Sequence, residues 1–316
     1  MRSRSSAEHG SRWPRSPACD DEVVDDITQL DLPDGRTIDV RVTGPENGLP
    51  LVFHHGTPGA ATASRALAKA TADRGLLLIT TSRPGYGDST RQPGRRVVDV
   101  VDDIDAVLDH LAVDRCVVAG WSGGGPHALA CAARLDRAQA ALVIAGVGPF
   151  GASDLDFLAG MGQDNIDEFG AALQGEGPLR EYLEAQRPEL VVADAAGIIR
   201  SLRSILPEID QSIITDQFGA DLAESFHEAL RVGVDGWLDD DLAFVAPWGF
   251  DLDEIRVPVS IWQGSLDLMV PYAHGQWLSR NIPGVAATLR DGDGHLSILL
   301  GAIDEMLDGL IDSTRG

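Results

Sequence analysis

Near-continuous apolar runs are the feature that most restricts how this chain can fold. Four of them lie in its first half, and each is followed by a turn that contains glycine: Leu51–Phe53, Leu76–Ile79, Cys116–Ala119 and Ala141–Ala145. Because these runs do not alternate between apolar and polar residues, we expect strands that are buried on both faces, as in a parallel sheet. Crossover helices must then cover both sheet faces. The sequence therefore predicts a three-layer α/β sandwich.

The two ends of the chain extend this pattern. Near the start, strand-like segments at Ile27–Leu32 and Thr37–Thr43 flank an Asp-Gly pair, which predicts a hairpin. Near the end, we expect strands at Val257–Trp262 and Ala286–Leu289, and then an amphipathic helix from Leu296 to Leu310.

The clearest crossover helix is defined by apolar residues three and four positions apart. The apolar face of this helix is formed by Val97, Val101, Ile104, Leu108 and Leu111. We expect its outer face to be acidic and to carry Asp99, Asp102, Asp103 and Asp109.

Residues 149–250 break the alternation of strands and helices. Helix-like segments at Leu179–Arg187 and Phe218–Arg231 have no strand between them, which predicts an inserted helical subdomain. This region holds 20 acidic residues and five arginines, hence −15 of the net charge of −24. We interpret that charge first as a solvated surface; the alternative is an acidic entrance that favours neutral or cationic substrates.

The composition excludes several classes of protein. With 25 Lys and Arg against 49 Asp and Glu, and no basic stripe, the chain is unsuited to nucleic acid. No apolar run is long enough to span a membrane. Residues 1–20 lack the apolar centre of a secretory signal, and we expect a disordered extension. Three scattered cysteines predict neither a disulfide framework nor a metal site, and we expect a cytoplasmic protein.

One serine stands in a sequence with specific chemical meaning. Gly120-Trp121-Ser122-Gly123-Gly124 follows the Cys116–Ala119 strand and opens a helix, so it fits G-x-S-x-G in a strand-turn-helix context. The strained turn would leave Ser122 Oγ exposed at the carboxyl edge of the sheet, and side chains at positions 120 and 124 would collide with neighbouring elements. We therefore predict that Ser122 is a nucleophile. A structural Gly-Ser turn is the alternative.

A serine nucleophile needs a histidine base and a carboxylate that orients it. Asp267 follows the Val257–Trp262 strand, and His295 follows the Ala286–Leu289 strand, so both are expected at the same sheet edge as Ser122. Asp291 and Asp293 are possible substitutes for Asp267.

The other histidines are weaker candidates. We expect His9, His110, His227 and His274 at the surface and His127 packed against the sheet. His54 and His55 are adjacent on a strand and would point to opposite faces, which argues against a metal pair. No metal or cofactor is required by this chemistry.

A third component is a turn that can aim backbone N–H groups at a developing oxyanion. His55-Gly56-Thr57-Pro58 follows the Leu51–Phe53 strand, and we predict the amides of Thr57 and Gly123 as the two donors.

Taken together, these motifs resemble those of the α/β hydrolase superfamily, in particular its capped branch with a serine nucleophile. The resemblance rests on His55-Gly56-Thr57-Pro58, Arg83-Pro84-Gly85-Tyr86-Gly87, the Gly120–Gly124 turn, and the order Ser122, Asp267, His295. It implies a mostly parallel, eight-stranded sheet formed by residues 21–148 and 251–316. It further implies that residues 149–250 form a helical cap over the nucleophile, between the sixth and seventh core strands.

The predicted function is hydrolysis of small or medium carboxylic esters through an acyl-enzyme. We expect a neutral, apolar small-molecule substrate; the oligomeric state is not predicted. The alternatives are an enzyme similar to proline iminopeptidases, whose substrate amine Glu181 or Glu184 could bind, a C–C bond hydrolase, and a lyase or perhydrolase that uses the same triad. A ligand-binding receptor with a vestigial triad is a further class.

Overall fold

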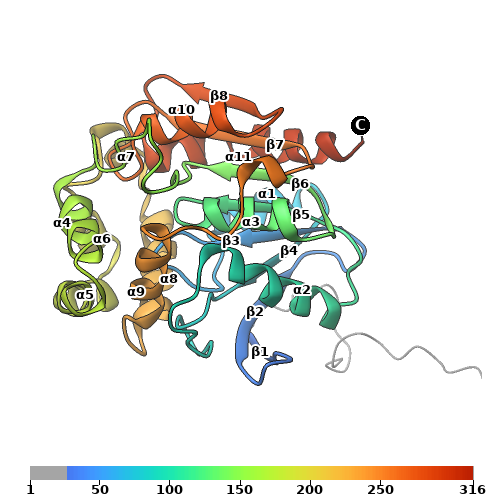
Figure 1. Cartoon of the computed structure of the whole chain (residues 1–316), viewed down its shortest axis with the longest axis horizontal. Coiled ribbons are helices and arrows are strands. Elements are labelled where there is room, and N and C mark those ends of the chain that lie inside the picture. The colour runs from blue at the N-terminus through green and yellow to red at the C-terminus, as the bar shows by residue number, and fades with distance from the viewer. Residues whose placement is uncertain (1–26, 316) are drawn as a thin grey trace, which may run out of the picture.

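A computed structural model describes residues 27–315 of the chain, so the predicted extension of residues 1–20 lies outside the described residues. Eight strands form one sheet in the order β1-β2-β4-β3-β5-β6-β7-β8 (Figure 1). Their bounds are β1 Thr28–Asp31, β2 Thr37–Thr43, β3 Leu49–His54, β4 Leu76–Thr81, β5 Cys116–Trp121, β6 Ala138–Ile144, β7 Val259–Gly264 and β8 Ala286–Arg290.

The predicted parallel strands form the centre of this sheet. β4, β3, β5, β6, β7 and β8 pair in parallel, whereas β2 is antiparallel to both β1 and β4. All six residues of β4 are buried, as its apolar run predicts. The hairpin at Asp34-Gly35 lies at one edge of the sheet, where β1 exposes most of its residues.

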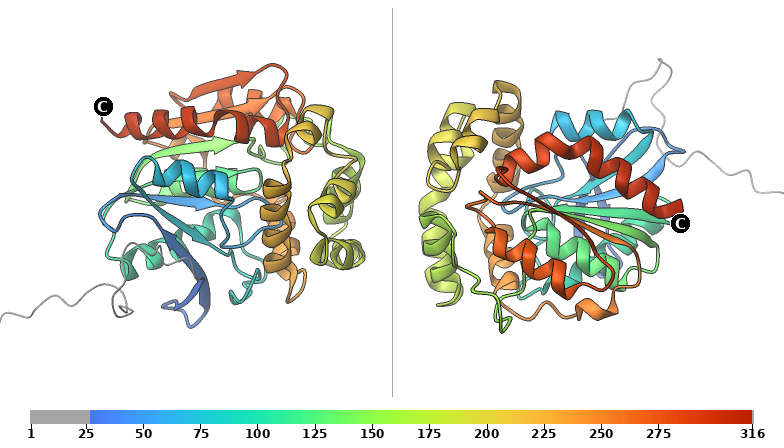
Figure 2. Two further views of the ribbon diagram at one scale, coloured as in Figure 1. Left: turned by 180° about the vertical axis from the view of Figure 1, so that it is seen from behind. Right: turned by 90° about the horizontal axis from the view of Figure 1, so that it is seen from above.

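Helices cover both faces of the sheet (Figure 2). One face carries α1 and α11, and the other carries α2, α3 and α10. Their bounds are α1 Arg65–Ala72, α2 Val100–His110, α3 Gly124–Arg134, α10 Tyr272–Asn281 and α11 His295–Asp312, and short 3-10 helices occupy Val97–Asp99, Leu252–Glu254 and Ser313–Arg315.

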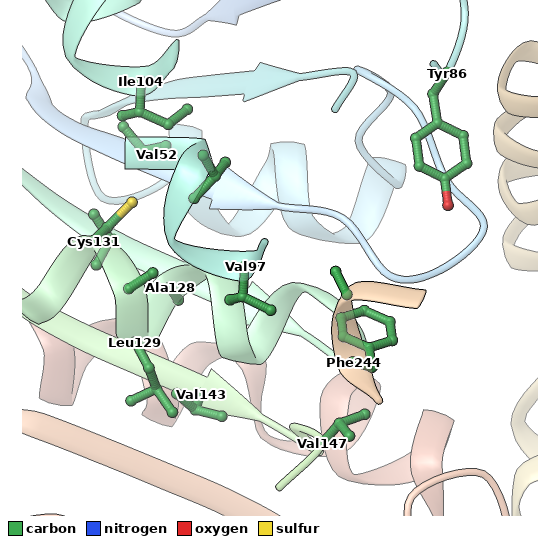
Figure 3. Packing of buried hydrophobic residues seen from close by; sticks show 14 of the residues in the cluster. Val52, Tyr86, Val97, Ile104, Ala128, Leu129, Cys131, Val143, Val147 and Phe244 are labelled. Atoms are coloured by element: carbon green, nitrogen blue, oxygen red, sulfur yellow. The ribbon is translucent and has the colours of Figure 1, made fainter. Parts of the chain in front are cut away.

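Two hydrophobic clusters follow from these layers. The larger one lies between the sheet and α2 and α3, where Val52, Ile104 and Leu129 are almost fully buried (Figure 3). The same cluster continues to Phe244 beyond the carboxyl ends of the strands. This continuity joins the core to the helices inserted after β6.

The inserted helices, which we call the cap, lie between β6 and β7 in sequence. In Figures 1 and 2, α8 and α9 lie between the sheet and the outer helices α4–α6. The cap helices are α4 Gln163–Ala172, α5 Glu176–Val191, α6 Ala195–Ser201, α7 Glu208–Ile213, α8 Asp216–Leu230 and α9 Asp235–Phe244. The domain boundaries at residues 149 and 250 stay predictions.

Three sequence interpretations need correction. Asp103 was expected on the outer face of α2, but it is buried and paired with Arg36. His274 was expected at the surface, but its ring is buried, accepts a hydrogen bond from the Gly148 N–H at 3.0 Å and donates to the Phe157 carbonyl at 2.9 Å. Burial lowers the pKa of His274 to about 4, so the imidazole is neutral. Its two hydrogen bonds connect Gly148 and Phe157 in the segment that leads into the cap.

The third correction concerns the cap's charge, which we interpreted first as a solvated surface. Four of its aspartates are almost fully buried, namely Asp210, Asp239, Asp240 and Asp241. In the described part of the chain, no helix is long and apolar enough to cross a membrane.

Candidate active site

Ser122 lies in the sharp turn between β5 and α3. Its φ is +57°, a left-handed conformation that L-residues rarely adopt. A Cβ on Gly120 would lie 2.1 Å from the Gly124 carbonyl oxygen, and one on Gly124 would lie 2.2 Å from the His54 carbonyl oxygen. Both positions therefore require glycine, for the steric reason that the sequence suggested.

His295 and Asp267 meet at the same edge of the sheet. Asp267 Oδ2 lies 2.8 Å from His295 Nδ1, and both side chains are almost fully buried. Three further N–H donors hold the carboxylate: the backbone of Met269 and Val270 bonds Oδ1, and Gln263 Nε2 bonds Oδ2 at 2.9 Å. This arrangement fixes the carboxylate and, through it, the orientation of the imidazole.

Asp210, from α7 of the cap, holds the turn that carries His295. Its carboxylate accepts hydrogen bonds from the His295 N–H at 2.7 Å, the Ser297 N–H at 2.8 Å and the Ser297 hydroxyl at 2.7 Å. These N–H groups begin α11, so a buried carboxylate caps that helix from a distant segment. Sequence reasoning missed this residue because nothing around it marks a contact 85 residues along the chain.

Thr57 and Gly123, the predicted oxyanion donors, face each other. A Cβ on Gly123 would lie 2.3 Å from Thr57 Oγ1, so the two segments approach as closely as glycine permits. Within residues 27–315, neither the Thr57 N–H nor the Gly123 N–H donates to another protein group. Both N–H groups are therefore available to a ligand.

The Arg83 side chain holds the Thr57 segment by hydrogen bonds. Its guanidinium donates to the carbonyls of His55 at 2.7 Å and Gly56 at 3.0 Å and to Thr57 Oγ1 at 3.1 Å. Its charge is balanced by Asp240 of α9, whose Oδ2 lies 2.6 Å away. The sequence motif contained Arg83, but the role of its side chain was not predicted.

Asp240 connects the cap to this segment. It accepts a hydrogen bond from the Thr57 hydroxyl at 2.7 Å, from Tyr86 at 2.9 Å, and from Arg95 at 2.7 Å, in addition to its bonds with Arg83. Burial disfavours its charged form, but the guanidiniums of Arg83 and Arg95 outweigh burial and hold the pKa of Asp240 well below its usual value. The carboxylate is thus a fully compensated buried charge.

The remaining histidines near the turn are neutral supports. His55 Nδ1 donates to the Gly56 carbonyl at 2.6 Å, and its Nε2 accepts the Arg83 N–H at 3.3 Å. His127 donates to the Gly123 carbonyl at 2.9 Å. Burial, followed by the charge of Arg83, lowers the pKa of both rings, and it lowers the pKa of His54 to about 3. His54 lies against Cys131 instead of pairing with its neighbour.

A cavity of about 160 Å³ joins the turn to the cap. Ser122, Gly123, Thr57 and His295 line it from the core, together with Gly56 and Pro58. From the cap, α4 contributes Asp164 and Glu168 and α9 contributes Asp241, whereas Glu181 and Glu184 are exposed and do not line it.

The structure thus brings the predicted residues to one place. Asp267 does not line the cavity and lies behind His295. Among residues 27–315, no group of three or more His, Cys, Asp or Glu side chains is arranged to hold a metal ion.

Comparisons with known proteins agree with this architecture. A family model described as the alpha/beta hydrolase fold matches residues 50–165. The non-heme chloroperoxidase of Streptomyces lividans is 26% identical over 283 residues, which cover 87% of this chain and 94% of that protein. The pimeloyl-[acyl-carrier protein] methyl ester esterase of Aromatoleum aromaticum is 28% identical over 235 residues, which cover 71% and 82%.

A solved structure gives the same result for the fold. The bromoperoxidase from Bacillus anthracis superposes with a TM-score of 0.63 at 20% identity, over 92% of this chain and 100% of that one. The eight-stranded sheet, the serine turn after β5 and these matches lead to one conclusion. The chain has the α/β hydrolase fold, and it is similar in sequence to members of that superfamily.

Proposed function

We propose that this protein is a serine hydrolase that cleaves small carboxylic esters through an acyl-enzyme. The observation that carries the proposal is that Ser122 and His295 open into one cavity, while Asp267 Oδ2 lies 2.8 Å from His295 Nδ1 behind them. A strained serine, an oriented imidazole and unpaired N–H groups are the components that acyl transfer needs.

In the first half of the reaction, His295 Nε2 takes the proton of Ser122 as Oγ attacks the ester carbonyl. The N–H groups of Thr57 and Gly123 stabilise the negative oxygen of the tetrahedral intermediate. His295 then gives the proton to the departing alcohol, which leaves an acyl group on Ser122. Asp267 keeps the Nδ1 proton in place and stabilises the imidazolium.

In the second half, water replaces the alcohol. His295 takes a proton from water as its oxygen attacks the acyl carbonyl, and returns that proton to Ser122 Oγ as the acid leaves. The cavity of about 160 Å³ favours short acyl chains, since pockets that bind drug-sized ligands measure roughly 300–1,000 Å³. The relative named as a methyl ester esterase supports an ester as substrate.

The test is steady-state hydrolysis of p-nitrophenyl esters from acetate to octanoate by the wild type and Ser122→Ala. We expect turnover with acetate or butyrate, weaker turnover with octanoate, and a loss of at least about 10⁴-fold in kcat in the variant. A fluorophosphonate should label the wild type and not Ser122→Ala. Turnover retained by a folded Ser122→Ala protein would overturn the proposal.

A second candidate is perhydrolysis, which the similarity to a protein named non-heme chloroperoxidase favours. In this reaction hydrogen peroxide attacks the same acyl-enzyme in place of water, so the acyl group leaves as a peracid and Ser122 regains its proton. Peracid formed from acetate ester and peroxide, at a rate that exceeds hydrolysis, would rank this activity first.

A further inference from the structure

Two carboxyl groups form part of the cap's wall of the cavity. Glu168 from α4 and Asp241 from α9 both line it and interact directly with each other. Trp237, one helical turn before Asp241, donates from Nε1 to Glu168 Oε1 at 2.7 Å. Because Trp237, Asp241 and Phe244 are spaced by four and three residues, α9 turns all three toward the cavity.

Asp241 lacks a hydrogen-bond donor. Its side chain is almost fully buried, and within the described residues its Oδ2 has no N–H or O–H partner. Glu168 is also an acceptor when ionised, so the two carboxylates cannot satisfy each other without a proton. A buried carboxylate oxygen without a donor is unfavourable, because it has lost its bonds to water and gained none in return.

The surroundings of the pair supply no positive charge. Among the described residues, no lysine or arginine lines the cavity, whereas Asp164 and Glu189 add two more acidic groups. Arg95 acts on Asp241 only weakly, because it is bonded to Asp240. The aromatic lining residues are Trp121, Phe169, Tyr182, Phe226, Trp237 and Phe244.

In the protein alone, a proton resolves this conflict. Burial and the second negative charge raise the pKa of Asp241 well above its usual value, and burial raises the pKa of Glu168 to about 7. Besides Asp164 on the same helix, the titratable groups that face the pair are Tyr182 and Glu189 of α5 and Asp240 of α9. One proton shared between the two carboxyl groups would serve as the missing donor.

We propose that the Glu168–Asp241 pair binds a protonated amine of the substrate in the cavity that Ser122 lines. The ammonium takes the place of the shared proton: the proton leaves to solvent, and the cation supplies N–H donors to Asp241 and the positive charge that the proton had provided, so the net charge of the pair stays the same. The aromatic side chains around it favour the same cation.

The position of α9 links this site to the reacting serine. A Cβ on Gly123 would lie 3.0 Å from Phe244 Cζ, so Phe244 packs against the predicted oxyanion donor. Asp241 lies three residues earlier, about one helical turn along the axis. The substrate class is therefore a small ester or amide with a cationic amine near its acyl group. The sequence predicted a neutral, apolar substrate first and gave a substrate amine bound by Glu181 or Glu184 as an alternative; those two residues do not line the cavity.

The substrate class in this inference rests on the proposed hydrolase function. The amine site itself is tested by binding, which does not require turnover. The probes are benzylammonium, benzyl alcohol and toluene, which share a ring and differ in charge and donor capacity. Calorimetry at pH 8 should show benzylammonium binding to the wild type at least about tenfold more tightly than benzyl alcohol. Titration in buffers of different ionisation enthalpy near pH 6.5 should reveal proton release.

Matched variants assign the binding to the pair. Asp241→Asn and Glu168→Gln should each remove the preference for benzylammonium over benzyl alcohol, whereas Asp167→Asn, an equal charge change on the exposed side of α4, should retain it. Benzylammonium should also slow fluorophosphonate labelling of Ser122, which would locate it in the same cavity.

Equal affinity for benzylammonium and benzyl alcohol, or a preference that survives in both pair variants, would overturn the amine site. If benzylammonium binds as expected while no ester or amide is cleaved, the esterase proposal fails and the amine site stands. If esters are cleaved and benzylammonium does not bind, the reverse holds.

Discussion

Asp240 and Asp241 are neighbours on α9, both are almost fully buried, and they have opposite electrostatic surroundings. Asp240 is bonded to Arg83, Arg95, Tyr86 and the Thr57 hydroxyl. Asp241 faces another carboxyl group and has an oxygen without a donor. The pKa of Asp240 therefore falls and that of Asp241 rises, although burial alone would raise both.

The contrast separates two uses of a buried acid. The Asp240 side of α9 faces the core, and its charge is balanced by the guanidiniums of Arg83 and Arg95. Arg83 also holds the predicted oxyanion segment. The Asp241 side faces the cavity, where the protein leaves the charge to a proton or a ligand. A buried acid that the protein itself compensates is costly to replace because its partners would lose their counter-charge, whereas an uncompensated acid in a cavity is free to recognise a substrate.

Replacing Asp240 tests the compensated side and should have the largest effect. Asp240→Asn leaves Arg83 and Arg95 buried without their carboxylate, and we expect a loss of roughly 3–5 kcal/mol in the free energy of unfolding. It also releases the Thr57 hydroxyl, so kcat should fall under conditions where the variant is still folded. Urea unfolding and ester turnover measure the two effects.

Asp241→Asn is the matched control on the same helix. It removes one of two repelling carboxyl groups, and its amide can donate to Glu168, so stability should change little or increase. If Asp240→Asn and Asp241→Asn lower stability equally, the two environments do not differ as described.

A second prediction concerns Asp210, which is compensated by N–H and hydroxyl groups instead of arginines. Asp210→Asn replaces one accepting oxygen by an amide group that cannot accept, and we expect about 1.5–3 kcal/mol of destabilisation. Displacement of His295 should lower kcat by up to about 100-fold, with little change in KM. Ser297→Ala keeps the carboxylate and its two backbone bonds, so it should affect kcat far less. Equal kcat values in wild type and Asp210→Asn would show that Asp210 does not position the imidazole.

Much of the architecture could be predicted because it depends on local patterns. The apolar runs of β3, β4 and β5 and the Asp-Gly hairpin are encoded by adjacent residues. The glycines around Ser122 are required by contacts within the same turn, and the G-x-S-x-G pattern reports them directly. Residues at the carboxyl ends of parallel strands share one sheet edge, so the meeting of Asp267 and His295 could be expected as well.

The cap's charges could not be predicted in this way. The sequence Asp239-Asp240-Asp241 has the pattern of a solvated acidic run, and only the three-dimensional structure distinguishes its members. Asp240 meets Arg83 from 157 residues away, and Asp210 meets His295 from 85 residues away. His274 and Asp103 were assigned to the surface for the same reason: their partners come from distant segments. A polar residue in a helix pattern does not reveal which element covers it.

The pH dependence of stability is the most delicate test of the comparison. An acid whose folded-state pKa is raised stabilises the fold below its unfolded pKa, and that contribution is lost as the pH rises through the folded pKa. For Glu168 the window runs from its ordinary value of 4.5 to about 7. Asp240, whose pKa is lowered, contributes the opposite dependence, below pH 4, outside this window.

We therefore expect wild type to lose stability relative to Asp241→Asn between pH 5 and 8, by on the order of 2 kcal/mol. The variant lacks the Asp241 carboxyl group, whose pKa burial and the charge of Glu168 raise, so its stability should depend less on pH. Urea unfolding at each pH gives the free energy of unfolding of wild type and variant, and the difference between the two is plotted against pH. This difference removes the contributions of other carboxyl groups with raised pKa, such as Asp39 and Asp103. For Asp167→Asn, an exposed change on α4, the difference in free energy of unfolding from wild type should stay constant over the same pH range. A flat difference for Asp241→Asn as well would mean that the pair does not hold a proton, and the distinction between the two faces of α9 would then rest on Asp240 alone.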